Sequence, residues 1–133
     1  MTPASRNIGR LSREFARREL ATLVGTTGVR SAVLFSADGF EIASQATDSA
    51  AAARLAAIGS SLSALGSAIA AEAGLRDFER TMIESSDGTV LIMRVHGTRA
   101  MSLAAVADHG AVLGTLLWAT QRCCEALGRI AGE

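Results

Sequence analysis

Lysine is absent from this chain of 133 residues, so all 13 of its basic side chains are arginine. Without lysine, the sequence excludes a phosphate-loop lysine, a Schiff-base lysine and a serine–lysine catalytic pair. Net charge is absent as well, because 13 acidic residues balance the 13 arginines. A neutral chain gives no general electrostatic reason to bind nucleic acid or to enter an anionic membrane surface. We therefore expect neither kind of partner.

Cysteine is scarce, since Cys123 and Cys124 are the only two and are adjacent. Neighbouring cysteines rarely form a disulfide with each other, because the bridge strains the backbone between them. Their spacing also differs from the spaced pairs of zinc sites. Two reduced thiols indicate a reducing compartment, and the N-terminal region contains no apolar run typical of a signal peptide. We expect a cytoplasmic protein without a metal site.

Catalytic groups in a recognisable arrangement are also lacking. His96 and His109 have no serine or cysteine partner at a known catalytic spacing. Asp38 and Asp87 each precede glycine, which is typical of turn residues rather than of an acid–base pair. Arg94 interrupts an apolar run, and we expect its side chain either to reach past the sheet or to pair with a carboxylate. The sequence predicts a protein that is not an enzyme and has no cofactor.

The most informative stretch runs from Asp48 to Gly74 and predicts one long helix. Asp48 can cap its N-terminus, alanine favours its interior, and Gly74 can close its C-terminus. Five large apolar residues recur at helical spacing and fall within about 80° of one another around the axis: Leu55, Ile58, Leu62, Leu65 and Ile69. We expect this stripe to be buried against the sheet.

The opposite side of the same helix carries only small side chains, and no charged residue occurs from Leu55 to Ala71. Surface helices normally carry charge on the outer side. This helix is therefore suited to be covered on both sides, by the core of its own domain and by something else. Alanine and serine can also simply be tolerated by solvent. A membrane span is disfavoured, because the uncharged run is shorter than about 20 residues and contains four serines.

The remaining chain predicts a helix on each side of five strands. The expected helices cover 6–24 and about 112–131, the latter ending near Gly132, and the expected strands cover 32–37, 40–45, 78–85, 89–95 and 101–107. Asp38-Gly39 and Asp87-Gly88 are typical hairpin turns. In the second strand, alternation predicts Phe40 and Ile42 inward and Glu41 and Ala43 outward. We find no linker or repeat, so residues 1–133 are expected to form one domain with a core of about 6–131.

This order of elements resembles the Roadblock/LC7 family. The segments that carry the resemblance are Val33 to Gly39, Ile42 to Ser44, the small-residue helix, Asp87 to Met93, Leu103 to Val106, and Ala111 to Gly114. The resemblance implies an α+β domain built as an α/β/α sandwich. Its five-stranded antiparallel sheet would have the order 2-1-5-4-3, with the long helix on one face and the terminal helices on the other.

The resemblance further implies a homodimer that regulates or scaffolds a Ras-like small GTPase without chemistry of its own. Members of the family can accelerate GTP hydrolysis by reshaping the GTPase, without supplying a catalytic arginine. In such dimers the third strands pair edge to edge and the long helices lie together. An open strand edge needs such a cover, and a two-fold dimer supplies it. The alternative is a PAS- or profilin-like small-molecule sensor or a general dimerisation module, and a sensor would need a cavity with polar groups.

Two sets of residues follow as candidate sites. The dimer interface is expected to use the small side of the helix and the third strand: Ala57, Ser60, Ala64, Ser67, Ala71, Arg80, Met82 and Glu84. The GTPase is expected to bind the side of the helix that lies between the stripe of large apolar residues and the side of small residues: Arg54, Ser61, Ala68 and Glu72.

Overall fold

The computed structural model describes residues 10–97 and 99–131. The elements, in chain order, are α1 (Arg10–Val24), β1 (Val29–Ser36), β2 (Glu41–Gln45), α2 (Ser49–Glu72), β3 (Arg80–Ser85), β4 (Gly88–Val95), β5 (Met101–Asp108) and α3 (Leu113–Ala131). The expected start of the first helix at residues 6–9 and the expected end of the last one at Gly132 lie outside the described residues.

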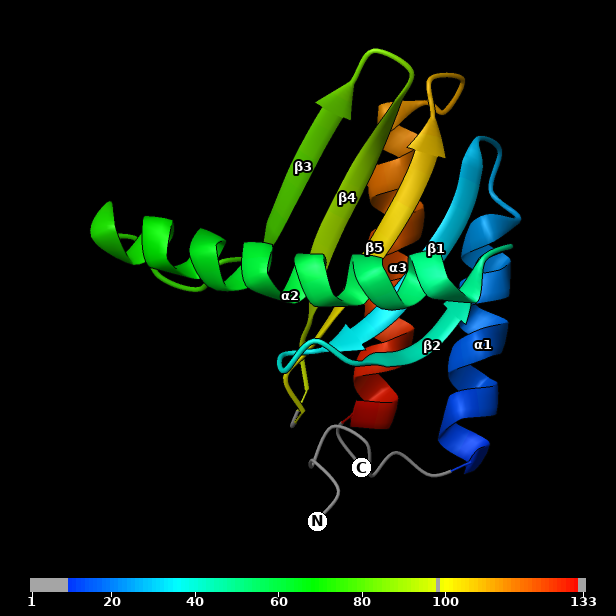
Figure 1. The fold of residues 1–133 in the computed structure, drawn as a ribbon, viewed down its shortest axis with the longest axis horizontal. Coiled ribbons are helices and arrows are strands. Elements are labelled where there is room, and N and C mark those ends of the chain that lie inside the picture. Colours follow the sequence, from blue (N-terminus) through cyan, green and yellow to red (C-terminus); the bar gives the residue numbers. More distant parts are fainter. Residues whose placement is uncertain (1–9, 98, 132–133) are drawn as a thin grey trace.

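The five strands form one antiparallel sheet in the order β2-β1-β5-β4-β3, which confirms the order that the family resemblance implies. α2 crosses one face of this sheet, whereas α1 and α3 cover the other (Figure 1). We call these the α2 face and the α1/α3 face. Because successive residues of a strand point to opposite faces, every strand residue is assigned to one of the two layers.

The β1–β2 hairpin turn is held by a buried serine. The Ser36 hydroxyl donates to the Asp38 carboxylate, and the Phe40 N–H donates to the Ser36 Oγ over 3.1 Å. Gly39 has φ +90°, a conformation that suits glycine. The turn predicted from Asp38-Gly39 is therefore present.

The orientation predicted for the residues of β2 is wrong in part. Ile42 and Ala43 are both buried, and Phe40 is exposed. The register between β1 and β2 shifts between Leu34 and Phe35, so that Leu34 pairs with Ala43 and Phe35 with Glu41. A bulge of this kind breaks the strict alternation of a strand and directs two consecutive residues to the same core.

The larger hydrophobic core lies between the sheet and the pair α1 and α3. Leu20, Leu103 and Leu127 are completely inaccessible to solvent and come from α1, β5 and α3. The smaller core lies under α2 and contains Val33, Phe35 and Ile92 of the sheet, together with Ala52, Ala56 and Ala104. The larger core thus rests on leucines, and the smaller one on alanines packed against a few large strand residues.

The predicted orientation of α2 is wrong. Ile58, Leu65 and Ile69 are 66%, 59% and 69% exposed, and Leu55 and Leu62 are only partly buried. The buried residues of α2 are Ala52, Ala56 and Gly59, which lie between the large and the small stripe. The helix therefore faces the sheet with its smallest residues. The large apolar residues lie on one flank of the helix, and the other small residues lie on the opposite flank.

Two glycines allow this close approach. A Cβ at Gly59 would lie 2.8 Å from Cζ of Phe35, and a Cβ at Gly66 would lie 2.5 Å from Cε1 of Phe78. Both distances are shorter than real Cβ contacts, so each glycine accommodates an aromatic ring beneath the helix. The caps of α2 match the sequence, since the Asp48 carboxylate accepts from the Ala50 N–H at 3.0 Å and Gly74 has φ +77°.

Gly59→Ala should destabilise the fold, although alanine is the better helix former by about 1 kcal/mol. The reason is that the new Cβ would lie 2.8 Å from the ring of Phe35, so the ring or the helix must shift, and we expect a net loss of about 1–2 kcal/mol in the free energy of unfolding. Gly114→Ala on α3, with no atom within 4 Å of its new Cβ, is the matched control and should be neutral or slightly stabilising. Urea denaturation of both variants measures this. Equal stabilisation by both would contradict the close approach of α2.

Candidate interaction surface

β3 is an edge strand, and no described strand pairs with its outer side. Its burial pattern is mostly exposed, with Thr81 and Met82 half-buried. α2 extends beyond this edge, so its C-terminal part has no strand of the sheet beneath it (Figure 1). An uncovered strand edge beside an unsupported helix is an arrangement that a second chain can complete.

The flank of α2 that carries the large residues is an exposed apolar surface. We call Ile58, Leu65 and Ile69 the apolar strip. Ile83 of β3, which is 44% exposed, lies on the same face of the sheet, because its neighbour Met82 packs into the α1/α3 core. By length and composition α2 is also the one described helix that could cross a membrane, a test that protein-covered helices pass as well. Exposed apolar residues gathered on one flank mark an interaction site.

The residues expected at the dimer interface fall into two groups. Ala57, Ala64, Ser67 and Ala71 lie on the flank opposite the apolar strip, largely exposed, and Ser60 is half-buried there. We call this flank the small-residue face. The strand residues Arg80 and Glu84 are exposed at the β3 edge, and Met82 is half-buried beside the core.

The residues expected to bind a partner share the outward side of α2, which faces away from the sheet. All four are exposed: Arg54, Ser61, Ala68 and Glu72. The Arg54 guanidinium approaches the Asp48 carboxylate at 4.0 Å, and both side chains are more than 60% exposed. A pair this exposed contributes little stability and leaves Arg54 available to a partner.

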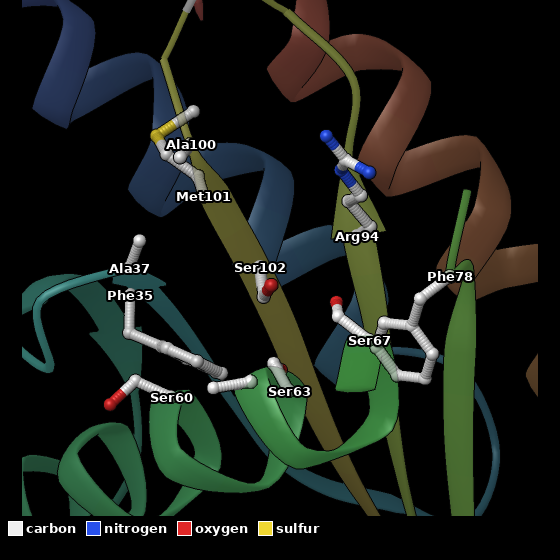
Figure 2. Close-up of a pocket in the computed structure, with 11 residues that line it drawn as sticks. Phe35, Ala37, Ser60, Ser63, Ser67, Phe78, Arg94, Ala100, Met101 and Ser102 are labelled. Carbon is white, nitrogen blue, oxygen red and sulfur yellow. The ribbon is translucent and has the colours of Figure 1, made fainter. Parts of the chain in front are cut away.

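A hollow of about 240 Å³ lies between the small-residue face and one end of the sheet. Figure 2 shows Phe35 and Phe78 on opposite sides of it, with Ser102 between them. Arg94 is exposed and also lines this hollow. No ion pair to Arg94 occurs among the described residues, so the expected pairing with a carboxylate is not seen there. Phe78 and Ser102 were not identified from the sequence, because the packing of α2 over Phe78 and the register of β5 bring them together.

Among the described residues, the titratable side chains of His96 and Glu79 lie at the surface as a pair. His96 Nε2 lies 2.9 Å from the Glu79 carboxylate, and both side chains are largely exposed. Within residues 10–97 and 99–131, no group of three or more histidine, cysteine or acidic side chains is placed to hold a metal ion. Trp118 is 62% exposed, with the Arg122 guanidinium 5.1 Å from its ring centre, and sequence reasoning missed this pair.

The adjacent cysteines are free and buried on α3. Burial raises the pKa of the Cys123 thiol to about 12, and Glu19 adds to the effect. Burial also raises the pKa of Cys124 far above its ordinary value, with smaller contributions from Cys123 and Glu125. Since the thiolate is the reactive form, these thiols behave as small apolar residues at neutral pH.

The topology defines a class of α/β/α domain with one helix on one face of a five-stranded antiparallel sheet and two on the other. A family model described as the Roadblock/LC7 domain matches residues 17–107. The chain belongs to this family. Among proteins with curated descriptions, no sequence matches it.

Solved structures show the same fold. The gliding protein MglB of Thermus thermophilus is 25% identical, with a TM-score of 0.86 and 98% of each chain covered. An MglB with a tetrameric arrangement is 26% identical, with a TM-score of 0.85 over 98% of this chain and 97% of the other. MglC of Myxococcus xanthus shares the fold at 11% identity and a TM-score of 0.59, covering 86% of this chain and 98% of its own.

The buried thiols predict how stability depends on pH. In the unfolded chain the thiols lose their protons near pH 8.5, whereas in the folded chain they keep them to about pH 12. The folded state therefore binds more protons in this range, and the free energy of unfolding should fall by roughly 2–5 kcal/mol between about pH 8.5 and pH 11. The chain has no tyrosine or lysine to titrate there. Urea denaturation should show the loss in the wild type and a nearly flat profile in Cys123→Ala/Cys124→Ala.

Proposed function

We propose that this chain is a homodimeric, non-catalytic regulator or scaffold of a Ras-like small GTPase and works in the cytoplasm. The observation that carries the proposal is the apolar strip, exposed on α2 next to the open edge of β3. Membership of the Roadblock/LC7 family supports a regulatory role rather than a catalytic one.

A two-fold axis through the middle of two paired β3 strands accounts for both exposed features. It would place the overhanging part of each α2 over the sheet of the other protomer, with the two helices antiparallel. The hollow beside the small-residue face lies at the end of the sheet where β5 begins, at Ala100 to Ser102, so the apolar strip faces the other way, towards the β3–β4 hairpin and the middle of β3 (Figure 1). The apolar strip, rather than the small-residue face, would then meet its copy.

The outward side of α2 remains free in such a dimer and is displayed twice. Arg54 and Glu72 give it one charge of each sign near the two ends of the helix. Membership of the Roadblock/LC7 family supports a GTPase as the partner, since the family resemblance implies Ras-like GTPases. Because the hollow and the histidines offer no nucleophile–base pair within the described residues, any effect on GTP hydrolysis would arise from the GTPase's own residues.

Leu65→Arg should convert the dimer into a monomer, because it places a charge in an apolar helix contact. Ala64→Arg is the matched control, since the neighbouring residue lies on the small-residue face and is also exposed. Light scattering at micromolar concentration should give a dimer for the wild type and Ala64→Arg, and a monomer for Leu65→Arg.

The reverse result, a monomer only for Ala64→Arg, would restore the small-residue face as the helix contact. A wild type that is monomeric at these concentrations would remove the dimer altogether. Circular dichroism of each variant shows whether it is folded.

Arg54→Glu/Glu72→Arg should weaken binding to the cognate Ras-like GTPase at least tenfold, because both charges lie on the outward side of α2. Arg17→Glu, at an exposed position of α1, is the control for a general change in charge and should bind as the wild type does. Binding is measured by calorimetry with the GTPase loaded with GDP or a non-hydrolysable GTP analogue, followed by single-turnover hydrolysis.

If no GTPase from the same genome binds, the partner is wrong. If a GTPase binds the double variant and the wild type equally, the partner is right, but the outward side of α2 is not the surface that binds the GTPase.

A further inference from the structure

The hollow beneath α2 is built from a row of three different groups on adjacent strands. Phe35 of β1 pairs with Ser102 of β5, and Ser102 pairs with Arg94 of β4. All three lie on the α2 face, where the row offers an aromatic ring, a hydroxyl and a guanidinium in sequence. The strand register thus brings together an apolar surface, a hydrogen-bonding group and a positive charge.

The helix contributes the opposite wall. Ser60, Ser63 and Ser67 of α2 line the hollow at helical spacing. The Oγ of Ser63 is shielded from solvent and has no hydrogen-bond partner within the described part of the chain. A shielded hydroxyl without a partner is costly, so a ligand that supplies one would be favoured.

The two glycines of α2 fix the aromatic ends of this hollow. Because Gly59 and Gly66 have no side chain, the rings of Phe35 and Phe78 lie beneath the helix instead of filling the space between them. Figure 2 shows the two rings apart, with Arg94 on the side away from α2. The hollow is therefore a consequence of the helix packing.

The charges identify the ligand. Within residues 10–97 and 99–131, Arg94 is the one charged residue that lines the hollow, and its guanidinium has no hydrogen-bond or ion-pair partner there. A guanidinium binds a carboxylate through two parallel hydrogen bonds, and one positive charge balances one carboxylate. A volume of about 240 Å³ exceeds the roughly 150 Å³ of a cavity that holds benzene, so the hollow has room for a benzene ring bearing a carboxylate.

We propose that this hollow binds a small monocarboxylate with an aromatic or similarly compact apolar group. The carboxylate lies against Arg94 and the hydroxyl of Ser102, and the apolar group lies between the rings of Phe35 and Phe78. The site is on the flank opposite the apolar strip, so it stays open when two copies of that strip meet. It does not depend on the GTPase, and either proposal can fail without the other.

Benzoate tests the proposal, with benzamide as a neutral probe of the same shape. Titration of the isotope-labelled wild-type protein, followed by NMR, should give a Kd of roughly 1 mM for benzoate, typical of a ligand of this size, with amide shifts centred on Arg94 and Ser102. Benzamide should bind at least tenfold more weakly. Inorganic phosphate at the same concentrations should not bind, since it lacks the apolar part.

Arg94→Gln should weaken benzoate binding at least tenfold. Arg30→Gln removes the same charge from an exposed position of β1 outside the hollow and should leave binding unchanged. Ser102→Leu, which fills the middle of the row, should abolish binding and provides a second variant if the first does not fold. Equal binding of benzoate and benzamide, equal binding by Arg94→Gln and the wild type, or shifts centred outside the hollow would each overturn the proposal.

Discussion

The contact between Gly59 and the ring of Phe35 sets the distance between α2 and the sheet, and the surface of the protein depends on it. A helix that approaches this closely can carry only its smallest residues on the buried side, here Ala52, Ala56 and Gly59. Its large residues Ile58, Leu65 and Ile69 are then displaced to one flank, and Ser60 and Ser67 lie on the other. The apolar strip and the hollow are therefore two results of one packing arrangement.

The order of elements, the strand order and the β1–β2 turn could be predicted from the sequence, because hydrophobic periodicity, turn residues and the family resemblance all bear on them. The orientation of α2 could not, because the general rule buries large residues. That rule fails where a buried ring such as Phe35 already occupies the space beneath the helix. The bulge in β2 and the row Phe35–Ser102–Arg94 depend on register, which no single stretch of sequence specifies.

The three exposed sides of α2 are suited to different tasks. The apolar strip has the chemistry of a permanent contact between copies of the chain, because it is large, uncharged and beside an open strand edge. The outward side is polar and mixed in charge, as is typical of reversible contacts between proteins. The small-residue face borders a hollow with one positive charge. The three proposals, for assembly, partner recognition and ligand binding, thus concern three different directions around the axis of one helix.

The burial of Cys123 and Cys124 has a practical consequence for experiments that test assembly and docking. Maleimide dyes and nitroxide spin labels attach to thiolates, and both native thiols remain protonated and enclosed at neutral pH. Towards such reagents the natural chain is equivalent to a cysteine-free background. A single cysteine introduced on the outward side of α2 would therefore carry the only label, and fluorescence or spin–spin distances could report on assembly and docking without altering the native core.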